Sequence, residues 1–597
     1  MYNRNFKQQN KIGELRPNQL ITTFGPGAIH DAVKDSLTIL DINYWGETGR
    51  RIYDARLASY FGVDYFCSPK TSYGQDVPAI SFPNYHVCSN SKCCRLFNIK
   101  DHFKLEEYLK QGSTCPDCGY RAYPSRFVVA CKDGHLDDFP WSWWVHRGKK
   151  GCNGNLKLIS TGETSTLGEM FVECTKCETR RSMAGATDKV QFAEAGYTCT
   201  GRHPHRPKEG NRKCDCTEIF PAQRGASNIY FPVIRSAISI PPWTNPLYIL
   251  LDEHYAMLCN YKRDFGEDGV TKIYENYFKE NYPRDAFNKA LENREKKIKE
   301  FIEIKEMEYK AFTHHNDPSY KRDIRYFKAT EDNVPNYLQK YFSRIIKIER
   351  LREVMVLQGF MRIDPPEPEA DSLKRMVKLT ATKKPNSWLP GVEINGEGIF
   401  IEFNKEVVRK WLNSPTVKQL SAQYKTLFDA YCAERKWENI KERDAKYVLL
   451  HTFAHLMIKE MALHSGYSST AIKERIYSDT DSSDDGMCGI LFYTGSSDKE
   501  GSLGGLVELG EEEKFKSILK SALENSLMCT TDPECTNSEI DVDTLNGSAC
   551  HSCAMIAETA CENGNRLLDR SLITPLDGKE GNSFFKDLIG ELCGIVL

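Results

Sequence analysis

Cysteines at short, paired spacings are the residues of this sequence best suited to chemistry. The chain has 22 cysteines among 597 residues. The first set joins Cys88 and Cys93 to a Cys-Pro-Asp-Cys turn at Cys115 and Cys118. Two such pairs give four thiolates, and four sulfurs at about 2.3 Å complete the tetrahedral shell of Zn²⁺. The spacing predicts a structural zinc ribbon in which Cys94 is the neighbour that could shift the register.

A second set follows. Cys174 and Cys177 form a Cys-x-x-Cys pair, Cys199 comes next, and Cys214 and Cys216 compete for the fourth position. We expect a four-sulfur zinc site in which Cys214 is slightly favoured over Cys216.

Between the first and second sets lie four further candidate ligands: Cys131, His135, His146 and Cys152. They could form an additional mixed site. The favoured interpretation is that His135 makes hydrogen bonds in a loop and that Cys152 is a spare thiol.

The third set lies near the C-terminal end, where Cys529 and Cys535 precede Cys550, Cys553 and Cys561. We assign a zinc site to Cys550, Cys553, Cys561 and either Cys529 or Cys535. A Cys-x-x-Cys pair can instead be a thioredoxin-like redox site. That alternative requires a βαβ context and leaves the other three cysteines without a role.

All these sites would be structural, because four protein ligands leave no open position for water. We expect two to three Zn²⁺ ions in the protein. The first residues show no apolar signal region and no cleavage site, which favours the reducing cytoplasm, where cysteine pairs bind metal rather than form disulfides. No run of about 18 apolar residues occurs, so no membrane partner is expected.

Catalytic motifs are missing from the sequence. No Gly-x-x-x-x-Gly-Lys-Ser/Thr motif is present, so the acidic stretch 247–255 has no phosphate-binding loop to serve. His451 and His455 have a metal-capable i, i+4 spacing, but Thr452 stands where a zinc protease has its glutamate. A buried helix with hydrogen-bonded histidines is the favoured interpretation, and no intrinsic enzymatic activity is expected.

Charge gives little support to independent nucleic-acid binding. With 80 basic and 82 acidic residues, the formal net charge is −2, whereas nucleic-acid-binding domains are usually basic. Any contact with phosphates would be local. The candidates for it are Arg180, Arg181, Arg202 and Lys213.

The secondary structure expected around these residues indicates a multidomain α+β protein. It combines zinc-ribbon-like modules, a helical middle region and an α/β C-terminal zinc-binding domain. The expected divisions are an N-terminal α+β region (1–80), a cysteine-rich region (81–222), a mainly helical region with amphipathic arms (223–365), an α+β connector (366–440) and a C-terminal zinc-binding domain (441–597).

Local patterns support these divisions. Helical spacing of apolar residues marks the segments 289–312 and 336–360. Asn395-Gly396 predicts the turn of a hairpin within 391–404. Helices are expected near 404–413 and 441–463, and a buried strand follows Met487.

Several long segments together resemble the DrmB family, a component of the DISARM antiphage system of bacteria. The resemblance covers residues 16–570 and rests on "RPNQLITTFGPGAI", "RFVVACKDGHLDDFPWSWWVH", "RGASNIYFPVIRSAISIPPW", "RLREVMVLQGFMRI", "HTFAHLMI" and "NGSACHSCAMIAETACENGNRLLDR". From about Arg443 the chain is also similar to the zinc-binding domain of MrfA-type helicases. That similarity carries the four-cysteine cluster of the domain onto Cys550, Cys553 and Cys561, with the upstream "CTTDPEC" leaving the fourth ligand open.

The resemblance implies a non-catalytic partner of a DrmA-like superfamily-2 helicase ATPase, the two forming a complex that engages foreign DNA. ATP hydrolysis would come from the partner. Two alternatives remain open: an assembly subunit that does not touch DNA, and a redox or hydrolytic enzyme that uses the C-terminal cysteines or the His451/His455 pair.

Overall fold

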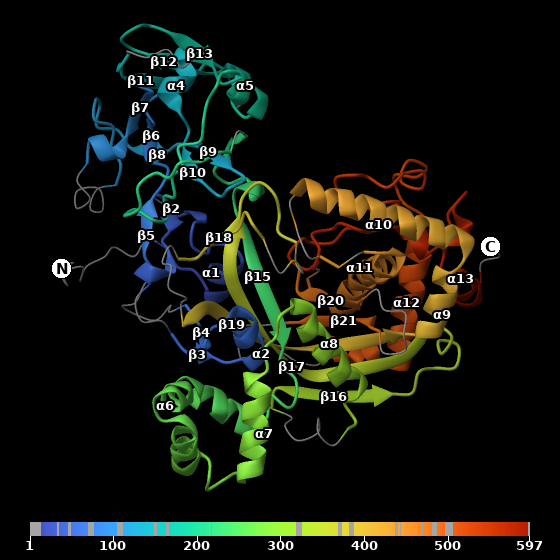
Figure 1. The fold of residues 1–597 in the computed structure, drawn as a ribbon. Coiled ribbons are helices and arrows are strands. Elements are labelled where there is room, and N and C mark those ends of the chain that lie inside the picture. Colours follow the sequence, from blue (N-terminus) through green and yellow to red (C-terminus); the bar gives the residue numbers. More distant parts are fainter. Residues whose placement is uncertain are drawn as a thin grey trace.

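A nine-stranded sheet runs through the centre of the molecule (Figure 1). The structure is a computed structural model. It describes residues 13–594 except 33–34, 46–48, 70–76, 104–111, 148–151, 163–165, 217, 318–324, 368–369, 371–372, 381–386, 436, 438–439, 442, 469, 480–485 and 496–504.

The strands of the central sheet come from four distant parts of the chain. Its main path is β15-β17-β19-β21-β20, while β16 and β18 pair with β17, β4 pairs with β19, and β3 pairs with β4. Their bounds are β3 (Arg51–Ile52), β4 (Tyr65–Cys67), β15 (Phe231–Ile238), β16 (Phe327–Asp332), β17 (Phe342–Met361), β18 (Val377–Lys378), β19 (Trp388–Phe403), β20 (Ile472–Ser478) and β21 (Cys488–Thr494).

The prediction of a helix over 336–360 was wrong, because most of this segment is the 20-residue strand β17. Its apolar residues include many β-branched side chains, which favour strands. Ile346 and Ile348 lie on one face of the sheet, in a core with Phe400, whereas Ile345 lies on the opposite face with Ile399. Burial on both faces removes the simple alternation that marks a half-exposed strand, so the sequence pattern alone did not separate strand from helix.

The predicted hairpin at Asn395-Gly396 is also absent, because both residues lie inside the continuous strand β19. Gly396 has another role there. A Cβ atom at this position would lie 1.6 Å from the carbonyl oxygen of Thr494, at the end of β21. Glycine therefore permits the close approach of two strands rather than a turn.

Helices cover both faces of the central sheet. On one face, α8 (Phe301–Thr313) places Ile302, Tyr309 and Phe312 in a core with residues of β17, β19 and β20. The largest core lies on the other face. It is covered by α9 (Lys405–Leu412), α10 (Pro415–Arg435), α11 (Ala445–Ser465), α12 (Glu512–Ser526) and α13 (Lys586–Cys593).

The central sheet contains strands from both sides of the predicted boundary at residue 441. Strands β20 and β21, which follow α11, pair with each other and join the sheet through β19. The C-terminal region therefore shares one sheet and one core with residues that precede it. The helices expected near 404–413 and 441–463 correspond to α9 and α11, and the buried strand expected after Met487 is β21.

The cysteine-rich region lies at one end of the molecule (Figure 1). It contains a six-stranded sheet in the order β13-β12-β11-β7-β6-β8 and a three-stranded sheet in the order β10-β9-β14. The bounds are β6 (Tyr85–Cys88), β7 (Arg95–Asn98), β8 (Ala122–Pro124), β9 (Phe127–Cys131), β10 (Leu136–Asp138), β11 (Leu156–Ser160), β12 (Met170–Cys174), β13 (Arg180–Ser182), β14 (Ile219–Gln223), α4 (Trp141–His146) and α5 (Lys189–Glu194).

Smaller elements connect this region to the central sheet. A three-stranded sheet in the order β1-β2-β5 precedes it. The bounds here are α1 (Pro17–Thr22), β1 (Ile29–Asp31), β2 (Ser36–Ile39), α2 (Ala55–Phe61) and β5 (Ala79–Ser81).

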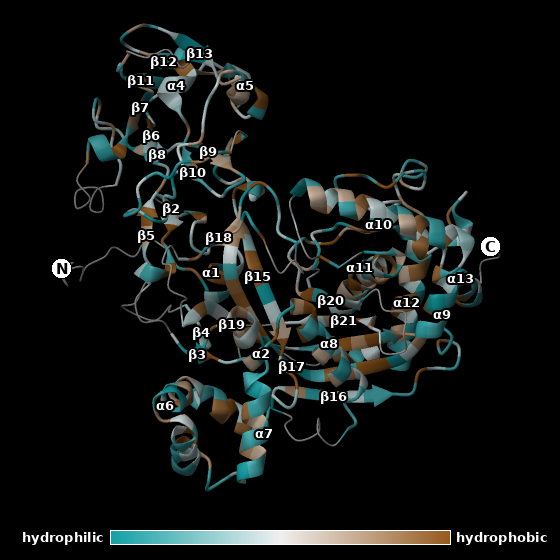
Figure 2. Cartoon of the chain, viewed as in Figure 1, coloured by the Kyte–Doolittle hydropathy of each residue, from teal (hydrophilic) through white to brown (hydrophobic). Residues whose placement is uncertain are grey.

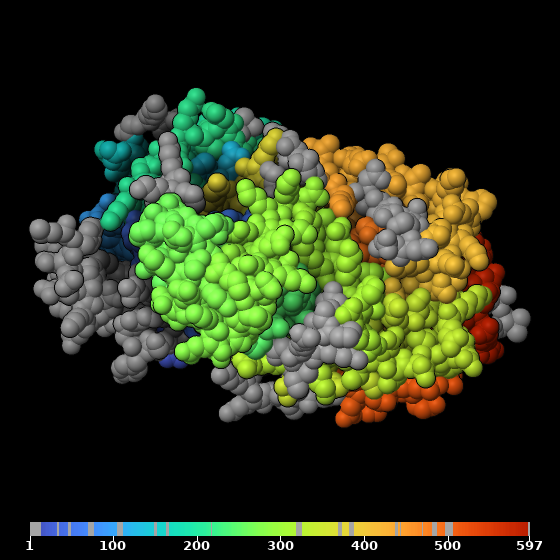
Figure 3. Space-filling view, turned by 60° about the horizontal axis from the view of Figure 1, so that its bottom comes forward, coloured from blue at the N-terminus to red at the C-terminus, as the bar shows by residue number. Residues whose placement is uncertain are grey.

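Two helices, α6 (Pro246–Tyr277) and α7 (Arg284–Glu295), form a lobe beside the sheet (Figure 1), and the surface of this lobe is the light green area of Figure 3. The backbone of α6 is kinked at Gly266. The lobe has its own core, in which Leu251 and Ile273 of α6 pack with Phe287 of α7. Within the predicted helical region 223–365, this lobe is a part whose core is formed between helices.

Hydropathy follows this architecture. Figure 2 shows hydrophobic residues along the central strands and α11, and hydrophilic residues along much of α7. Among the described residues, no helix combines the length and apolar character needed to cross a membrane. The predicted α+β, multidomain fold class is confirmed by the mixture of sheets and helices.

Candidate metal centres

Cluster A consists of Cys88, Cys93, Cys115 and Cys118. The Sγ atoms of Cys88 and Cys118 are 3.4 Å apart, and those of Cys93 and Cys115 are 3.7 Å apart. Disulfide sulfurs would be about 2.05 Å apart, whereas sulfurs at about 2.3 Å from one tetrahedral ion lie roughly 3.8 Å from each other. The structure thus brings together the four residues of the first predicted set at the spacing of a metal site.

Backbone N–H groups lie close to two sulfurs of cluster A and favour the thiolate, the form that binds metal, although burial raises the pKa of Cys88 and Cys115. The N–H of Asn90 donates to Cys88 Sγ at 3.4 Å, and a backbone hydrogen bond at Tyr120 lowers the pKa of Cys118 to about 7. Cys94 is not a member, since its thiol donates to the carbonyl of Ser91 at 3.1 Å.

Cluster B consists of Cys131, His135, Cys199 and Cys214. Cys131 Sγ lies 3.4 Å from His135 Nδ1, 3.7 Å from Cys199 Sγ and 4.0 Å from Cys214 Sγ. The thiol of Cys216, the competing candidate, donates to the carbonyl of Glu218 at 3.4 Å and also makes a hydrogen bond with Cys131.

Cluster C consists of His146, Cys152, Cys174 and Cys177. His146 Nε2 lies 3.3 Å from Cys177 Sγ, and Cys152 Sγ lies 3.5 Å from Cys174 Sγ. The other ring nitrogen, Nδ1, faces the carbonyl of Ser142 at 2.7 Å. A hydrogen bond to a carbonyl on one ring nitrogen is the usual way in which a metal-binding imidazole is oriented.

Two further observations fit cluster C to a metal ion. A Cβ atom on Gly154 would lie 2.5 Å from Cys174 Sγ, so glycine leaves room for this sulfur to enter the cluster. Hydrogen bonds from Thr179 lower the pKa of Cys177 to about 6, which favours its thiolate near neutral pH.

The second predicted set is therefore divided between two clusters. Cys174 and Cys177 lie in cluster C, and Cys199 and Cys214 lie in cluster B. Strand pairing explains the division. Leu156 of β11 pairs with Cys174 of β12, which draws the preceding Cys152 toward it, whereas Ile219 of β14 pairs with Cys131 of β9, which draws the preceding Cys214 toward that strand. The sequence favoured His135 as a hydrogen-bonding loop residue and Cys152 as a spare thiol. In the structure, His135 belongs to cluster B and Cys152 to cluster C.

Cluster D consists of Cys529, Cys535, Cys550 and Cys553. The Sγ distances are 3.4 Å for Cys529 to Cys550 and 3.7 Å for both Cys535 to Cys553 and Cys550 to Cys553. The pKa of Cys550 is lowered to about 6, against the effect of burial, by hydrogen bonds that include the Thr531 hydroxyl.

Cluster D differs from the predicted third set. Both Cys529 and Cys535 belong to it, and Cys561 does not. Cys561 Sγ lies instead 3.2 Å from His451 Nε2 on α11. The stretch 547–565 forms turns, and this irregular path directs Cys561 away from the other four sulfurs. The residues 550 and 553 also lack the helix expected of a thioredoxin-like redox pair.

Of the four basic residues considered for phosphate contact, two are engaged in the fold. Arg202 donates to Asp137 at 2.5 Å and to Asp138 at 3.1 Å. Arg181 lies 3.8 Å from the Trp144 ring and donates to its carbonyl at 2.9 Å.

The other two basic residues reach solvent. Arg180 is exposed and lies 4.2 Å from the Phe171 ring. The Lys213 side chain is 90% exposed and lies 3.5 Å from Asp215. These two positions remain accessible to a phosphate.

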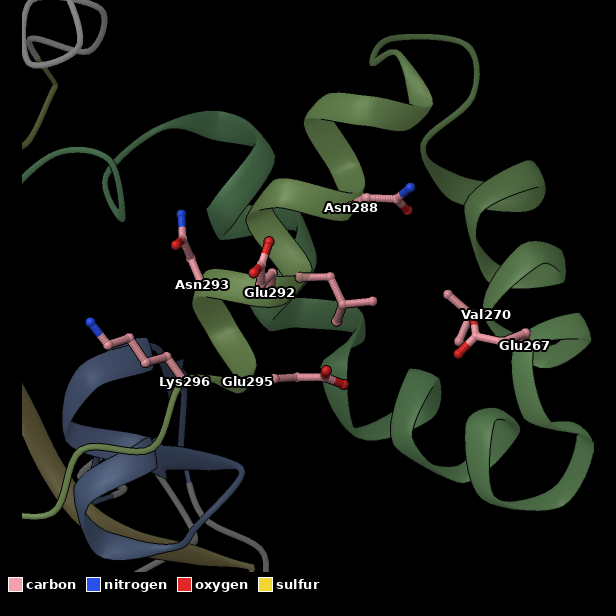
Figure 4. Close-up of a pocket in the computed structure, with 8 residues that line it drawn as sticks. Glu267, Val270, Asn288, Glu292, Asn293, Glu295 and Lys296 are labelled. Carbon is pink, nitrogen blue, oxygen red and sulfur yellow. The ribbon is translucent and has the colours of Figure 1, made fainter.

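A surface pocket of about 490 Å³ lies between α6 and α7 (Figure 4). Its charged lining includes Glu267, Glu292, Glu295 and Lys296. None of the eight residues that line it is a cysteine or histidine, so it offers no set of donors like those of clusters A to D.

Two family models match parts of the chain, and one relative matches most of its length. Residues 16–231, which contain clusters A to C, match a family described as a domain of unknown function, DUF8724. Residues 453–554, which contain cluster D, match the MrfA Zn-binding domain. The chain is 45% identical to the DISARM protein DrmB of Bacillus paralicheniformis over 579 residues, which cover 94% of this chain and all of the relative.

Proposed function

The chain belongs to the family of the DISARM protein DrmB, and on that basis we propose that it is a non-catalytic, zinc-binding subunit of a DISARM antiphage complex. The whole-length similarity is the observation that carries this proposal. The match to the MrfA Zn-binding domain supports zinc as the metal.

Clusters A to D would hold the zinc ions. Each offers four cysteine or histidine donors, the ligand types of structural zinc sites. Such an ion orders loops and short strands, and the complete set of protein ligands keeps reactant water away from it. A cytoplasmic location suits these thiols, because a reducing compartment preserves them.

The motor of the complex would be a separate superfamily-2 helicase-like ATPase. This chain has no phosphate-binding loop of the Gly-x-x-x-x-Gly-Lys-Ser/Thr type. Its role would be to dock on the ATPase and help it bind or process foreign DNA.

Contact with DNA would be local and electrostatic. Arg180 and Lys213 are the two accessible candidates in the cysteine-rich region. Each phosphate contact releases counterions, so affinity falls as salt rises, with a slope of about −0.9 per contact in log affinity against log salt.

Co-expression of this chain with the products of neighbouring genes tests the proposal. We expect a superfamily-2 ATPase to purify with it in moderate salt, and DNA-stimulated ATP hydrolysis to change when the subunit is omitted. A monomer that purifies without an ATPase would contradict the proposal.

Charge reversal tests the DNA contact within that complex. Arg180→Glu and Lys213→Glu should each reduce the salt slope by about 0.9. Lys289→Glu, an exposed position on α7, serves as the matched control and should leave the slope unchanged. Salt slopes equal to the wild-type slope in all three variants would contradict the assignment of Arg180 and Lys213 as phosphate contacts.

A second candidate function is an assembly subunit that does not touch DNA. The formal net charge of −2 and the engagement of Arg181 and Arg202 within the fold favour it. Ultraviolet crosslinking of the complex to DNA separates the two, because only a DNA-contacting subunit forms adducts through this chain.

A further inference from the structure

A second group of potential ligands lies in the C-terminal half, apart from cluster D. It consists of His451 and His455 of α11, Glu474 of β20 and Cys561 of the following loop, and is called cluster E. Figure 1 shows α11 beside β20 and β21. His455 and Glu474 lie inside the segment 453–554 that matches the MrfA Zn-binding domain, whereas His451 and Cys561 lie outside it.

The donor atoms of cluster E converge in the interior. His451 Nε2 lies 3.0 Å from Glu474 Oε1 and 3.2 Å from Cys561 Sγ, and His455 Nε2 lies 3.4 Å from the same carboxylate oxygen. A tetrahedral Zn²⁺ with nitrogen and oxygen near 2.0 Å and sulfur near 2.3 Å separates its donors by roughly 3.3 to 3.6 Å. The side chains of both histidines and of Glu474 are fully buried.

Hydrogen bonds orient both imidazoles in the way that metal ligands require. His455 Nδ1 faces the carbonyl of Ala554 at 2.8 Å, and His451 Nδ1 faces the carbonyl of Leu567 at 3.3 Å. A carbonyl only accepts, so each Nδ1 carries the proton. In the neutral rings, both Nε2 lone pairs then point toward Glu474 and Cys561.

Without a cation, this arrangement leaves polar atoms unsatisfied. In the part of the chain that the structure describes, His455 Nε2 and Glu474 Oε2 are buried without a hydrogen-bond partner. A buried polar group without a partner loses the hydrogen bonds that water would give it, which destabilises the folded state. A nitrogen lone pair that faces a carboxylate or a thiolate is also repelled by it.

The loop around Cys561 supports its thiolate. The backbone N–H groups of Asn563 and Asn565 donate to Cys561 Sγ at 3.3 and 3.2 Å. Two N–H donors to one sulfur stabilise negative charge on it. The loop lies along the sheet, where the N–H of Glu474 donates to Ala560 and the N–H of Glu562 donates to Glu474 Oε1.

A purely ionic arrangement is the competing explanation. It needs two imidazolium rings to balance the carboxylate and the thiolate, with ring centroids only 4.5 Å apart. The carboxylate of Glu474 and the thiolate of Cys561 together place two negative charges in the interior beside the two rings. One divalent ion balances both charges while the two rings stay neutral.

We propose that cluster E binds one Zn²⁺ ion through His451 Nε2, His455 Nε2, a Glu474 oxygen and Cys561 Sγ. The ion joins α11, β20 and the 554–567 loop at one point. Because Ala554 directly follows Cys553 of cluster D and accepts from His455, it also links the two metal clusters. With four protein ligands, the site is structural.

Metal content of the full chain tests this proposal. Protein purified without chelators is analysed by inductively coupled plasma mass spectrometry as the wild type, His455→Gln and Glu474→Gln. We expect each variant to contain one zinc equivalent fewer than the wild type. Cys488→Ser, which removes another buried thiol of the same sheet, is the control and should keep the wild-type content.

Anomalous scattering from wild-type crystals gives an answer even where a variant does not fold. Data collected just above and just below the zinc absorption edge should give a difference peak between the two Nε2 atoms. Peaks at clusters A to D with none at cluster E would overturn the proposal, as would unchanged zinc content in folded His455→Gln and Glu474→Gln.

Discussion

The cysteine-rich region and the central sheet keep their strands together by different means. Strands of the cysteine-rich region have three to five residues, and clusters A, B and C lie at their ends or in the loops between them. In the central sheet, β17 has 20 residues and β19 has 16, and both are largely buried. Short strands bury little apolar area, so the two regions should respond differently to loss of metal and to loss of core volume.

Cluster D shows that the difference depends on the local surroundings rather than on the number of thiols. Its loop is tied to the large C-terminal core by Arg570, a buried residue that donates to Asp532 at 2.8 Å and to the carbonyl of Ser526 at 3.2 Å. Cluster A lies beside a small core that contains Phe97 and Ile99. We expect metal loss to unfold the surroundings of cluster A and to loosen only the loop at cluster D.

Chelation should give the largest contrast between the two regions. Structural zinc provides an apparent stabilisation of about 10 to 16 kcal/mol per site in zinc-finger peptides, which is comparable to or larger than the whole stability of a typical domain. Hydrogen exchange measured by mass spectrometry should show loss of protection in β6 to β13 and retained protection in β17, β19 and β21. Equal loss in both regions would contradict the comparison.

Removal of one ligand should give the next largest effect. Cys88→Ser breaks cluster A and should remove one zinc equivalent together with protection of β6, β7 and β8. Cys94→Ser is the matched control, because this thiol is adjacent to the cluster in sequence and not part of it. Zinc analysis and hydrogen exchange of the two variants check the result, and a similar loss in both would remove the assignment.

Truncation of a side chain in the sheet core should lower the stability of the protein without loss of zinc. Phe400 of β19 is fully buried and packs near the rings of Tyr309 and Phe312. Phe400→Ala should lower the free energy of unfolding by about 3 to 5 kcal/mol and leave the zinc content unchanged. Urea denaturation measures the first quantity and elemental analysis the second, with Phe400→Leu as a milder control. A folded Phe400→Ala protein that lacks zinc would contradict the view that zinc stabilises the cysteine-rich region independently of the core of the central sheet.

Two glycines sharpen the comparison, because one lies in the sheet core and the other beside a metal cluster. Gly396→Ala should cost about 1 to 3 kcal/mol by overpacking β19 against Thr494, with zinc content unchanged. Gly154→Ala should displace Cys174 Sγ and remove one zinc equivalent from cluster C. Gly225→Ala has nothing within 4 Å of the added Cβ and is the control for both. Zinc loss in Gly396→Ala, or none in Gly154→Ala, would reverse the assignment of the two roles.

The resemblance stated from sequence is confirmed by the relative that matches along its whole length and by the zinc-binding-domain match. Long motifs made this possible, because they identify a family without knowledge of the fold. The grouping of ligands was harder. Cluster A uses adjacent pairs, so spacing alone selected the residues that the structure brings together. Cluster B encloses cluster C in the sequence, and the order of cysteines along the chain favoured the wrong partners.

Glu474 had no signal in the sequence that pointed to a metal, since it is one acidic residue within a strand. His451 and His455 had the helical spacing of ligands, yet the same pattern occurs in buried helices. Only the packing of α11 on β20 placed these three side chains near Cys561. The prediction of a helix over β17 was also wrong because the sequence does not show tertiary packing. Burial of both faces of the strand removes the alternation of apolar and polar residues that marks a half-exposed strand.

Residue types and short spacings were sufficient to predict the family, the α+β class and the kinds of ligand. Which thiols and imidazoles share a cluster, why a strand needs Gly396 and how Cys561 departs from cluster D became evident only from the folded chain. Those outcomes depend on strand register and on the packing of elements far apart in the chain. Short-range spacing carries no information about either.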